Sequence, residues 1–104
     1  MTDKPTRVQI LERGAALTAG DRDRTYGPPH LNFSACATLW EAYLSAKTRG
    51  GAAPKITAED VAHMMSLVKM SRTFYGGYHE DNYVDSATYE AIAGECRKIS
   101  VGET

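Results

Sequence analysis

Two adjacent segments, 56–75 and 80–99, constrain the fold most strongly, because each has apolar residues at helical spacing. In the first segment, Thr57 followed by Asp60 is typical of a helix start, with a hydroxyl to cap the helix and an acid in its first turn. The glycine pair 76–77 is expected to end that helix. Helices joined by so short a connection pack side by side and antiparallel. The sequence therefore predicts a helical hairpin.

Both helices of this hairpin place charged groups on their apolar stripes. At about 100° per residue, Arg72 projects close to Val61 and Val68. On the second helix, Asp81 and Asp85 share a stripe with apolar side chains. The first stripe consists of Val61, Met64, Met65, Val68 and Tyr75, and the second also contains Thr88, Ile92 and Ile99. We therefore expect a polar centre between the two helices.

The rest of the chain predicts two more helices and no strand. Residues 6–18 suit a short amphipathic helix, in which Gly14 costs roughly 1 kcal/mol relative to alanine. Residues 30–48 form a wide apolar face with Trp40 and Tyr43. The expected fold is all-α: about four helices in a small antiparallel bundle, forming one domain over residues 1–104 and assembling into a homo-oligomer. The end segments, 1–5 and 100–104, are expected to be loose, and Asp81 and Asn82 are candidate caps for the last helix, which would put Asp85 in its first turn.

Composition excludes several classes of protein. The formal net charge of −1 gives no basic excess for general nucleic-acid binding. No apolar run approaches the roughly 20 residues that span a bilayer, and the polar N-terminus lacks the apolar core of a secretory signal. Cys36 and Cys96 stand in predicted helices without a CxxC pattern, which favours free thiols on packing faces over a disulfide or a zinc site. These features predict a cytoplasmic protein.

The first candidate site is the polar centre of the hairpin. Lys69 and Arg72 are neighbours on one helix, and the antiparallel geometry brings them near Asp81 and Asp85. One interpretation is an enclosed salt-bridge network that fixes how the helices dock, although such pairs are weak evidence for stability. The other is a cationic pair that accepts phosphate, with the aspartates orienting the guanidinium.

The second candidate site is the connection 19–29, which ends in Tyr26-Gly27-Pro28-Pro29. It is predicted to be a polar loop, since two prolines cannot continue a helix. A solvated loop is one interpretation. The other is a loop that presents Arg22, Arg24 and the ring of Tyr26 to a phosphorylated, base-containing ligand, with Tyr75 and Tyr89 available to stack on a base.

A divalent metal is the third possibility. Mg²⁺ binds through one or two carboxylates and the phosphates of a substrate, and Asp81 with Asp85 have a suitable spacing. Glu59 and His63 are four residues apart, a spacing that would suit a transition metal. However, Asp60 and His63 point away from the apolar stripe, which favours a solvated first turn and a surface histidine. No GxGxxG, Walker A, HExxH or GxSxG pattern occurs. A covalent catalytic mechanism is unsupported.

As a set, several short strings resemble a family of small all-helical phage and prophage proteins of unknown function. These are Asp23 to Gly27, Asn32-Phe33, Leu39-Trp40, Thr57 to Ala62, Lys69, Arg72, Asp81-Asn82, Val84-Asp85 and Tyr89. The resemblance covers roughly residues 10–95. It implies an all-helical, phage-borne protein in the cytoplasm of an infected or lysogenic bacterial host.

More loosely, the chain resembles the all-α nucleoside triphosphate pyrophosphohydrolases, the MazG-like and dUTPase-like group. That group uses an ExxE on one helix and an ExxD on the next to hold Mg²⁺. Here the second helix has only the outward Glu41, and Asp81 and Asp85 are four residues apart. This departure argues against hydrolysis and is compatible with binding of nucleotide phosphates.

We therefore expect a small homo-oligomer that binds a nucleotide, such as a cyclic signalling nucleotide, without turning it over. Sequestration of such a host signal would serve counter-defence, and an intersubunit site is favoured because a small helical hairpin makes a shallow pocket. The alternatives are a Mg²⁺-dependent pyrophosphohydrolase and a protein–protein adaptor whose ion pairs are purely structural. The candidate ligand-binding residues are Arg22, Arg24, Tyr26, Lys69, Arg72, Tyr75, Asp85 and Tyr89, with Asp81 and Asp85 as candidate metal ligands.

Overall fold

A computed structural model describes residues 4–20 and 22–102 of the chain, and this part is all-helical, with no strand among those residues. Five helices follow one another: α1 (Thr6–Thr18), α2 (Arg22–Tyr26), α3 (Pro29–Lys47), α4 (Ala58–Arg72) and α5 (Glu80–Ser100). The predicted all-α class is confirmed, and the bounds of α1 agree with the predicted 6–18. Residues 1–3, 103 and 104, expected to be loose, lie outside the described residues.

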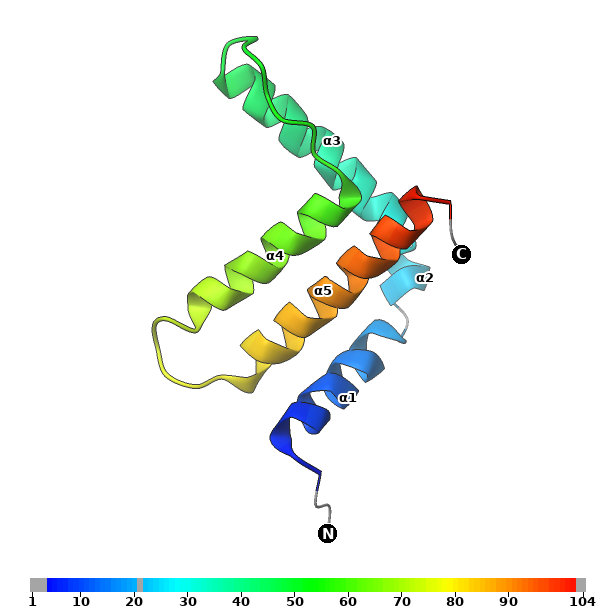
Figure 1. Cartoon of the computed structure of the whole chain (residues 1–104), viewed down its shortest axis with the longest axis vertical. Helices are drawn as coiled ribbons and strands as arrows, with labels where there is room; N and C mark the ends of the chain where they lie inside the picture. The colour runs from blue at the N-terminus through cyan, green and yellow to red at the C-terminus, as the bar shows by residue number, and fades with distance from the viewer. Residues whose placement is uncertain (1–3, 21, 103–104) are drawn as a thin grey trace.

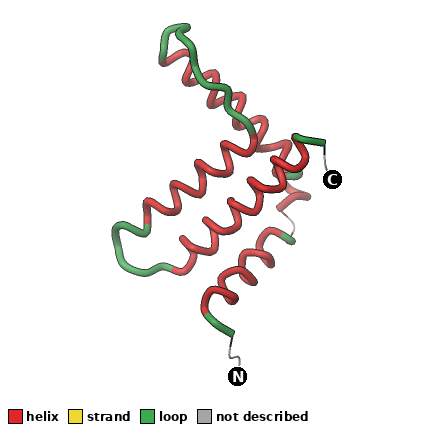
Figure 2. The backbone as a smooth tube through the Cα atoms, in the orientation of Figure 1, coloured by secondary structure: helices red, strands yellow, loops and turns green. Residues whose placement is uncertain are grey.

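The helices form a layer with a projecting arm and do not close into the predicted four-helix bundle. α4 and α5 make an antiparallel hairpin, and α1 packs along the other side of α5 in the same direction as α5 (Figure 1). α3 projects away from this layer, and the connection 48–57 returns along it to the start of α4 (Figure 2). The backbone N–H of Ile56 donates to Glu41 Oε1 over 2.5 Å. This bond ties α3 to the segment just before α4, where α3 joins the layer.

Small side chains allow the close packing of this layer. The fully buried positions are few, and only Val61 and Val84 among them are larger than cysteine. At the centre of the α4–α5 contact, the hydroxyls of Ser66 and Ser86 share a hydrogen bond of 2.8 Å. Cys96 is buried, and both Cys96 and Cys36 are free, as predicted. The remaining buried residues are Gly14, Ala37, Ala62 and Ala93.

The structure corrects three local predictions. Residues 22–26 of the predicted loop form the short helix α2. α5 begins at Glu80 with His79 at its N-cap, so neither Asp81 nor Asn82 caps it and Asp85 lies beyond its first turn. Its last residue is Ser100, which sequence analysis had placed in the loose tail. The predicted start of α4 is confirmed, because Thr57 and Asp60 form a complete capping box with bonds of 3.1 and 2.9 Å.

The predicted apolar stripe of α4 does not face α5. α5 covers the neighbouring sector of the helix, where Ala62, Ser66 and Lys69 lie, and only Val61 of the predicted stripe is buried. Met64 and Val68 are exposed on the opposite side. The small residues decide this outcome, because alanine and serine let two helices approach more closely than methionine and valine do.

Candidate functional site

A cavity with a volume of about 420 Å³ lies where α2 meets the layer. This size is within the range of about 300–1,000 Å³ that is typical of small-molecule sites. Five predicted ligand-binding residues, from three helices, line it: Arg22, Tyr26, Lys69, Asp85 and Tyr89. The remaining lining residues are Leu17, Thr18, Asp23, Gly27, Pro29, Asn32, Phe33, Thr88 and Ile92. The structure therefore brings together five predicted residues that are up to 67 positions apart in sequence, from Arg22 to Tyr89.

An ion pair between α4 and α5 forms one wall of this cavity. Lys69 Nζ lies 3.2 Å from Asp85 Oδ2, and their side chains are 18% and 35% exposed. An ammonium group has three donors. Asp85 therefore holds Lys69 in place and leaves further N–H groups for a ligand.

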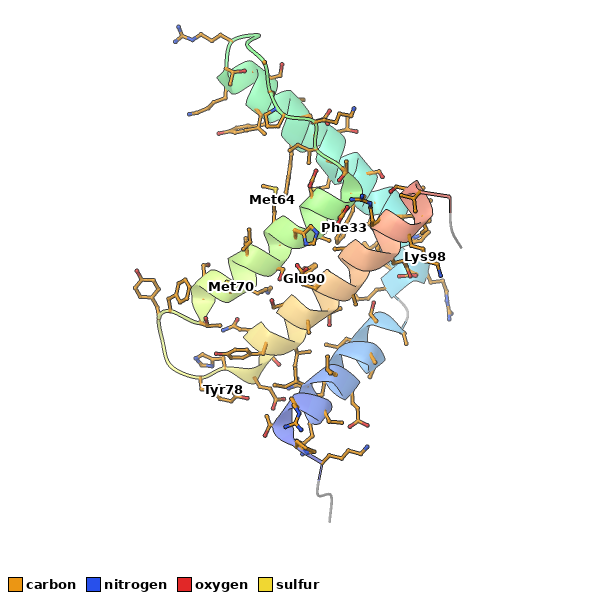
Figure 3. The ribbon with its side chains drawn as sticks, in the orientation of Figure 1. Phe33, Met64, Met70, Tyr78, Glu90 and Lys98 are labelled. Carbon is orange, nitrogen blue, oxygen red and sulfur yellow. The ribbon has the colours of Figure 1, made fainter. Side chains whose placement is uncertain are left out.

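A second part of the wall comes from α2 and is cationic and aromatic. Arg22 and Tyr26 stand one helical turn apart on α2 and are exposed. Within residues 4–20 and 22–102, the guanidinium of Arg22 has no carboxylate partner. A cation at a cavity that has no carboxylate partner among the described residues is suited to an anionic ligand. The rings of Phe33 and Tyr89, which also line the cavity, lie 6.3 Å apart, centroid to centroid. Figure 3 labels Phe33 near α5.

The turn between α2 and α3 positions this wall. Gly27 has a φ of 80°, which favours glycine because a Cβ is strained there. Pro28 then occupies the N-cap of α3 and Pro29 its first turn, where the missing N–H is harmless. The Asn32 amide donates back to the carbonyls of Gly27 and Pro28 over 3.1 and 3.4 Å. The YGPP string therefore builds a fixed bend at the cavity.

Three predicted site residues lie elsewhere. Arg72 is exposed and does not reach Asp81 or Asp85; it lines a shallow depression near the loop 73–79 together with Tyr75. Tyr75 is itself exposed, and Arg24 does not line the main cavity. The prediction of Arg72 beside the aspartates was wrong because Lys69, one turn earlier, occupies the sector that faces α5.

The structure also separates the two proposed metal ligands. Asp81 accepts from Arg13 of α1 over 2.7 Å, and Glu80 pairs with the same guanidinium. Asp85 instead pairs with Lys69. Across the described residues, no group of three or more His, Cys, Asp and Glu side chains is arranged to hold a metal ion. The two aspartates therefore anchor different helices to α5 and do not form a common carboxylate pair.

His63 has a role that sequence analysis missed. Its Nδ1 lies 3.0 Å from Glu90 of α5 and its Nε2 lies 3.1 Å from Glu59, and Arg97 also reaches Glu59. Glu90 points from α5 toward α4 in Figure 3. The hydrogen bond to Glu90, and then that to Glu59, raises the pKa of His63, while His63 and then Arg97 lower the pKa of Glu59. The spacing of Glu59 and His63 was visible in the sequence, but Glu90 as third member was not.

Stability is therefore expected to depend on pH through this cluster. The raised pKa of His63 gives a contribution that is complete below its ordinary value of 6.5 and is lost as pH rises through the folded-state pKa. The lowered pKa of Glu59 gives a contribution present above its ordinary value of 4.5 and lost as pH falls. Because these groups are largely solvated, the effect is at most about 1 kcal/mol. In thermal melts, the Tm of the wild type should be lower at pH 8 than at pH 6, and this difference should disappear in His63→Gln. An equal difference in the variant would contradict this assignment.

One protein family and two curated phage proteins match this chain. The family described as Domain of unknown function (DUF6378) matches residues 9–97. Two curated relatives are each 38% identical: the Gene 55 protein of Mycobacterium phage D29 over 98 residues, and the Gene 55 protein of Mycobacterium phage L5 over 96 residues. These alignments cover 86% and 92% of this chain but only 60% and 55% of the relatives. No solved structure matches the chain.

None of the described helices combines the length and the hydropathy that crossing a membrane requires.

Proposed function

The chain belongs to the DUF6378 family of unknown function and is similar to two phage proteins, and we propose that it binds a nucleotide without hydrolysing it. The observation that carries this proposal is the shared cavity of Arg22, Tyr26, Lys69, Asp85 and Tyr89. Lys69 and Arg22 supply charge-assisted donors for phosphate. Tyr26 supplies an exposed aromatic face for a base.

The chemistry of the cavity favours binding over turnover. Of the two proposed metal ligands, only Asp85 lies at the cavity, and it is already paired with Lys69. A Mg²⁺-dependent hydrolysis needs a metal that bridges carboxylates and phosphates. The nucleotide is therefore held by cations and rings, and its phosphoanhydride bonds remain intact.

This activity would suit sequestration of a host signalling nucleotide in the cytoplasm of an infected or lysogenic bacterium, as a counter-defence. The two phage relatives support a phage setting. The cavity described here is formed by one chain, so a site between subunits stays a prediction. A cyclic nucleotide and a linear nucleotide share the phosphate and base chemistry that this cavity offers.

Replacing Lys69 with methionine is expected to weaken nucleotide binding at least tenfold. The substitution keeps the aliphatic stem and removes the ammonium from the cavity wall. Arg72→Met is the matched control, because it removes a cation three residues along the same helix but outside the cavity. Isothermal titration with linear mono- and triphosphates and cyclic dinucleotides measures both variants. Equal loss in both, or no binding of any nucleotide to the wild type, would overturn the proposed site.

The fate of the nucleotide distinguishes binding from catalysis. After incubation with Mg²⁺ and denaturation of the protein, the bound nucleotide should be recovered intact by mass spectrometry. Release of a monophosphate and pyrophosphate that disappears in Asp85→Ala would instead establish a pyrophosphohydrolase.

A further inference from the structure

Two helices present apolar faces that nothing in the described chain covers. On α3 the face opposite buried Ala37 consists of Ala35, Leu39, Ala42, Tyr43 and Ala46, all exposed; we call it the outer face of α3. On α4 the face opposite buried Ala62 consists of Met64, Leu67, Val68 and Ser71; we call it the outer face of α4. Leu39 is 70% exposed and Leu67 is 58% exposed. Met64 projects from α4 on the side away from α5 (Figure 3).

The total surface is too large for a self-sufficient monomer. A compact monomer of 11.4 kDa is expected to expose about 5,800 Å², whereas this chain exposes 7512 Å². The radius of gyration is 15.9 Å, against about 13 Å for a compact domain of this length. Covering the excess of about 1,700 Å² on each of two copies would bury roughly 3,400 Å² in total, which is typical of obligate homodimers.

The chemistry of the two outer faces selects the kind of partner. The outer face of α3 has no charged side chain, and the one charged group in the sector of the outer face of α4 is the Asp60 carboxylate, which the capping box already engages. Neither face therefore suits a phosphate, a nucleic acid or an acidic peptide. Exposed methionine and leucine at helical spacing instead suit another apolar helix. The lengths also agree, because the 19 residues of α3 and the 15 of α4 correspond to about 28 and 22 Å.

We infer that a second copy of this chain covers both faces, with the outer face of α3 from each copy packed on the outer face of α4 from the other. A two-fold axis satisfies both contacts at once, since each copy supplies one α3 and one α4. In this arrangement α3, which projects from the layer in Figure 1, packs against the partner chain. The inference is independent of nucleotide binding, because neither face includes a residue that lines the cavity.

Sedimentation equilibrium of the wild-type chain tests this arrangement. The expected mass is twice the 11.4 kDa of one chain at micromolar concentration. Leu39→Glu and Leu67→Glu should each raise the dissociation constant at least 100-fold. Leu11→Glu is the matched control, because Leu11 is a comparably exposed leucine on α1, away from both faces, and this variant should remain dimeric. Circular dichroism confirms that each variant keeps its helices.

Cross-linking tests the pairing of the faces without a disruptive charge. In a mixture of Leu39→Cys and Leu67→Cys chains, a short bis-maleimide should join one chain of each kind, above the background that Cys36 and Cys96 give in the wild type. A monomeric wild type at 100 µM would overturn the inference. A dimer that survives both glutamate substitutions, or cross-links no more abundant than in the wild type, would overturn it equally.

Discussion

Replacing Gly14 with valine is expected to detach α1 from α5 and to destabilise the chain by about 2–3 kcal/mol, the upper part of the range of about 1–3 kcal/mol for overpacked contacts. Gly14 is the one buried residue of α1 among those described, and a Cβ there would lie 2.7 Å from Thr88 Oγ1. Thr88 has little freedom to move aside, because its hydroxyl donates to the Val84 carbonyl over 2.8 Å. Urea denaturation followed by circular dichroism measures the loss, and hydrogen exchange locates it to α1.

Gly94→Ala is the matched control for this prediction. Gly94 is also a helical glycine, but it is exposed and nothing lies within 4 Å of its would-be Cβ. The variant should gain about 0.5–1 kcal/mol of stability from helix propensity. If Gly14→Val were as stable as the wild type, the close approach of α1 to α5 would not exist in solution. Thr88 lines the cavity, so the variant should also bind nucleotide less tightly.

The helix that contains Gly14 could be predicted from the sequence, but the packing role of Gly14 could not. Sequence analysis identified the helix 6–18 and treated Gly14 as a propensity cost within it. The same glycine is in fact what allows α1 to lie on α5. A glycine that costs helix stability and one that permits close packing are identical in a single sequence, because the distinction depends on the partner helix.

Local signals were reliable where the chain satisfies its own hydrogen bonds. The capping box of Thr57 and Asp60 and the bend at Tyr26 to Pro29 depend on neighbouring residues, and the structure has both at the predicted positions. The end of α4 was predicted less well, because the helix ends at Arg72, before the expected break at Gly76-Gly77. Residues 22–26 form α2 because this short segment lies against the start of α3. The two prolines after Tyr26 signalled the break but not the helical turn before it.

Helical angles, by contrast, gave the position of each side chain on its helix but not the sector that a neighbour covers. Val61 and Arg72 share a stripe on α4, yet α5 lies against the next sector, so Lys69 reaches Asp85 and Arg72 does not. The cavity could be anticipated in part, because cations and tyrosines stood out from their surroundings. Phe33 and Ile92, which complete its lining, were interpreted only as packing residues.

Substitutions of Lys69 and Asp85 should distinguish a structural role of the polar centre from a role in ligand binding. Removing one partner leaves a largely buried charge without compensation, which costs about 3–5 kcal/mol for a fully enclosed pair. Since Asp85 is 35% exposed, solvent reduces this cost. We therefore expect Lys69→Met or Asp85→Leu alone to destabilise by about 1–2 kcal/mol. Thermal denaturation at pH 7 measures both.

The double variant Lys69→Met with Asp85→Leu decides between the interpretations. An apolar pair of similar size avoids the desolvation penalty, so the double variant should be more stable than either single variant and close to the wild type. If the pair exists only to dock α4 on α5, this variant would keep every property of the protein. If it holds phosphate, the well-folded double variant would lose nucleotide affinity at least tenfold, as Lys69→Met does. We expect the second result, because the ammonium of Lys69 lies at the cavity and a docking contact alone would not require it there.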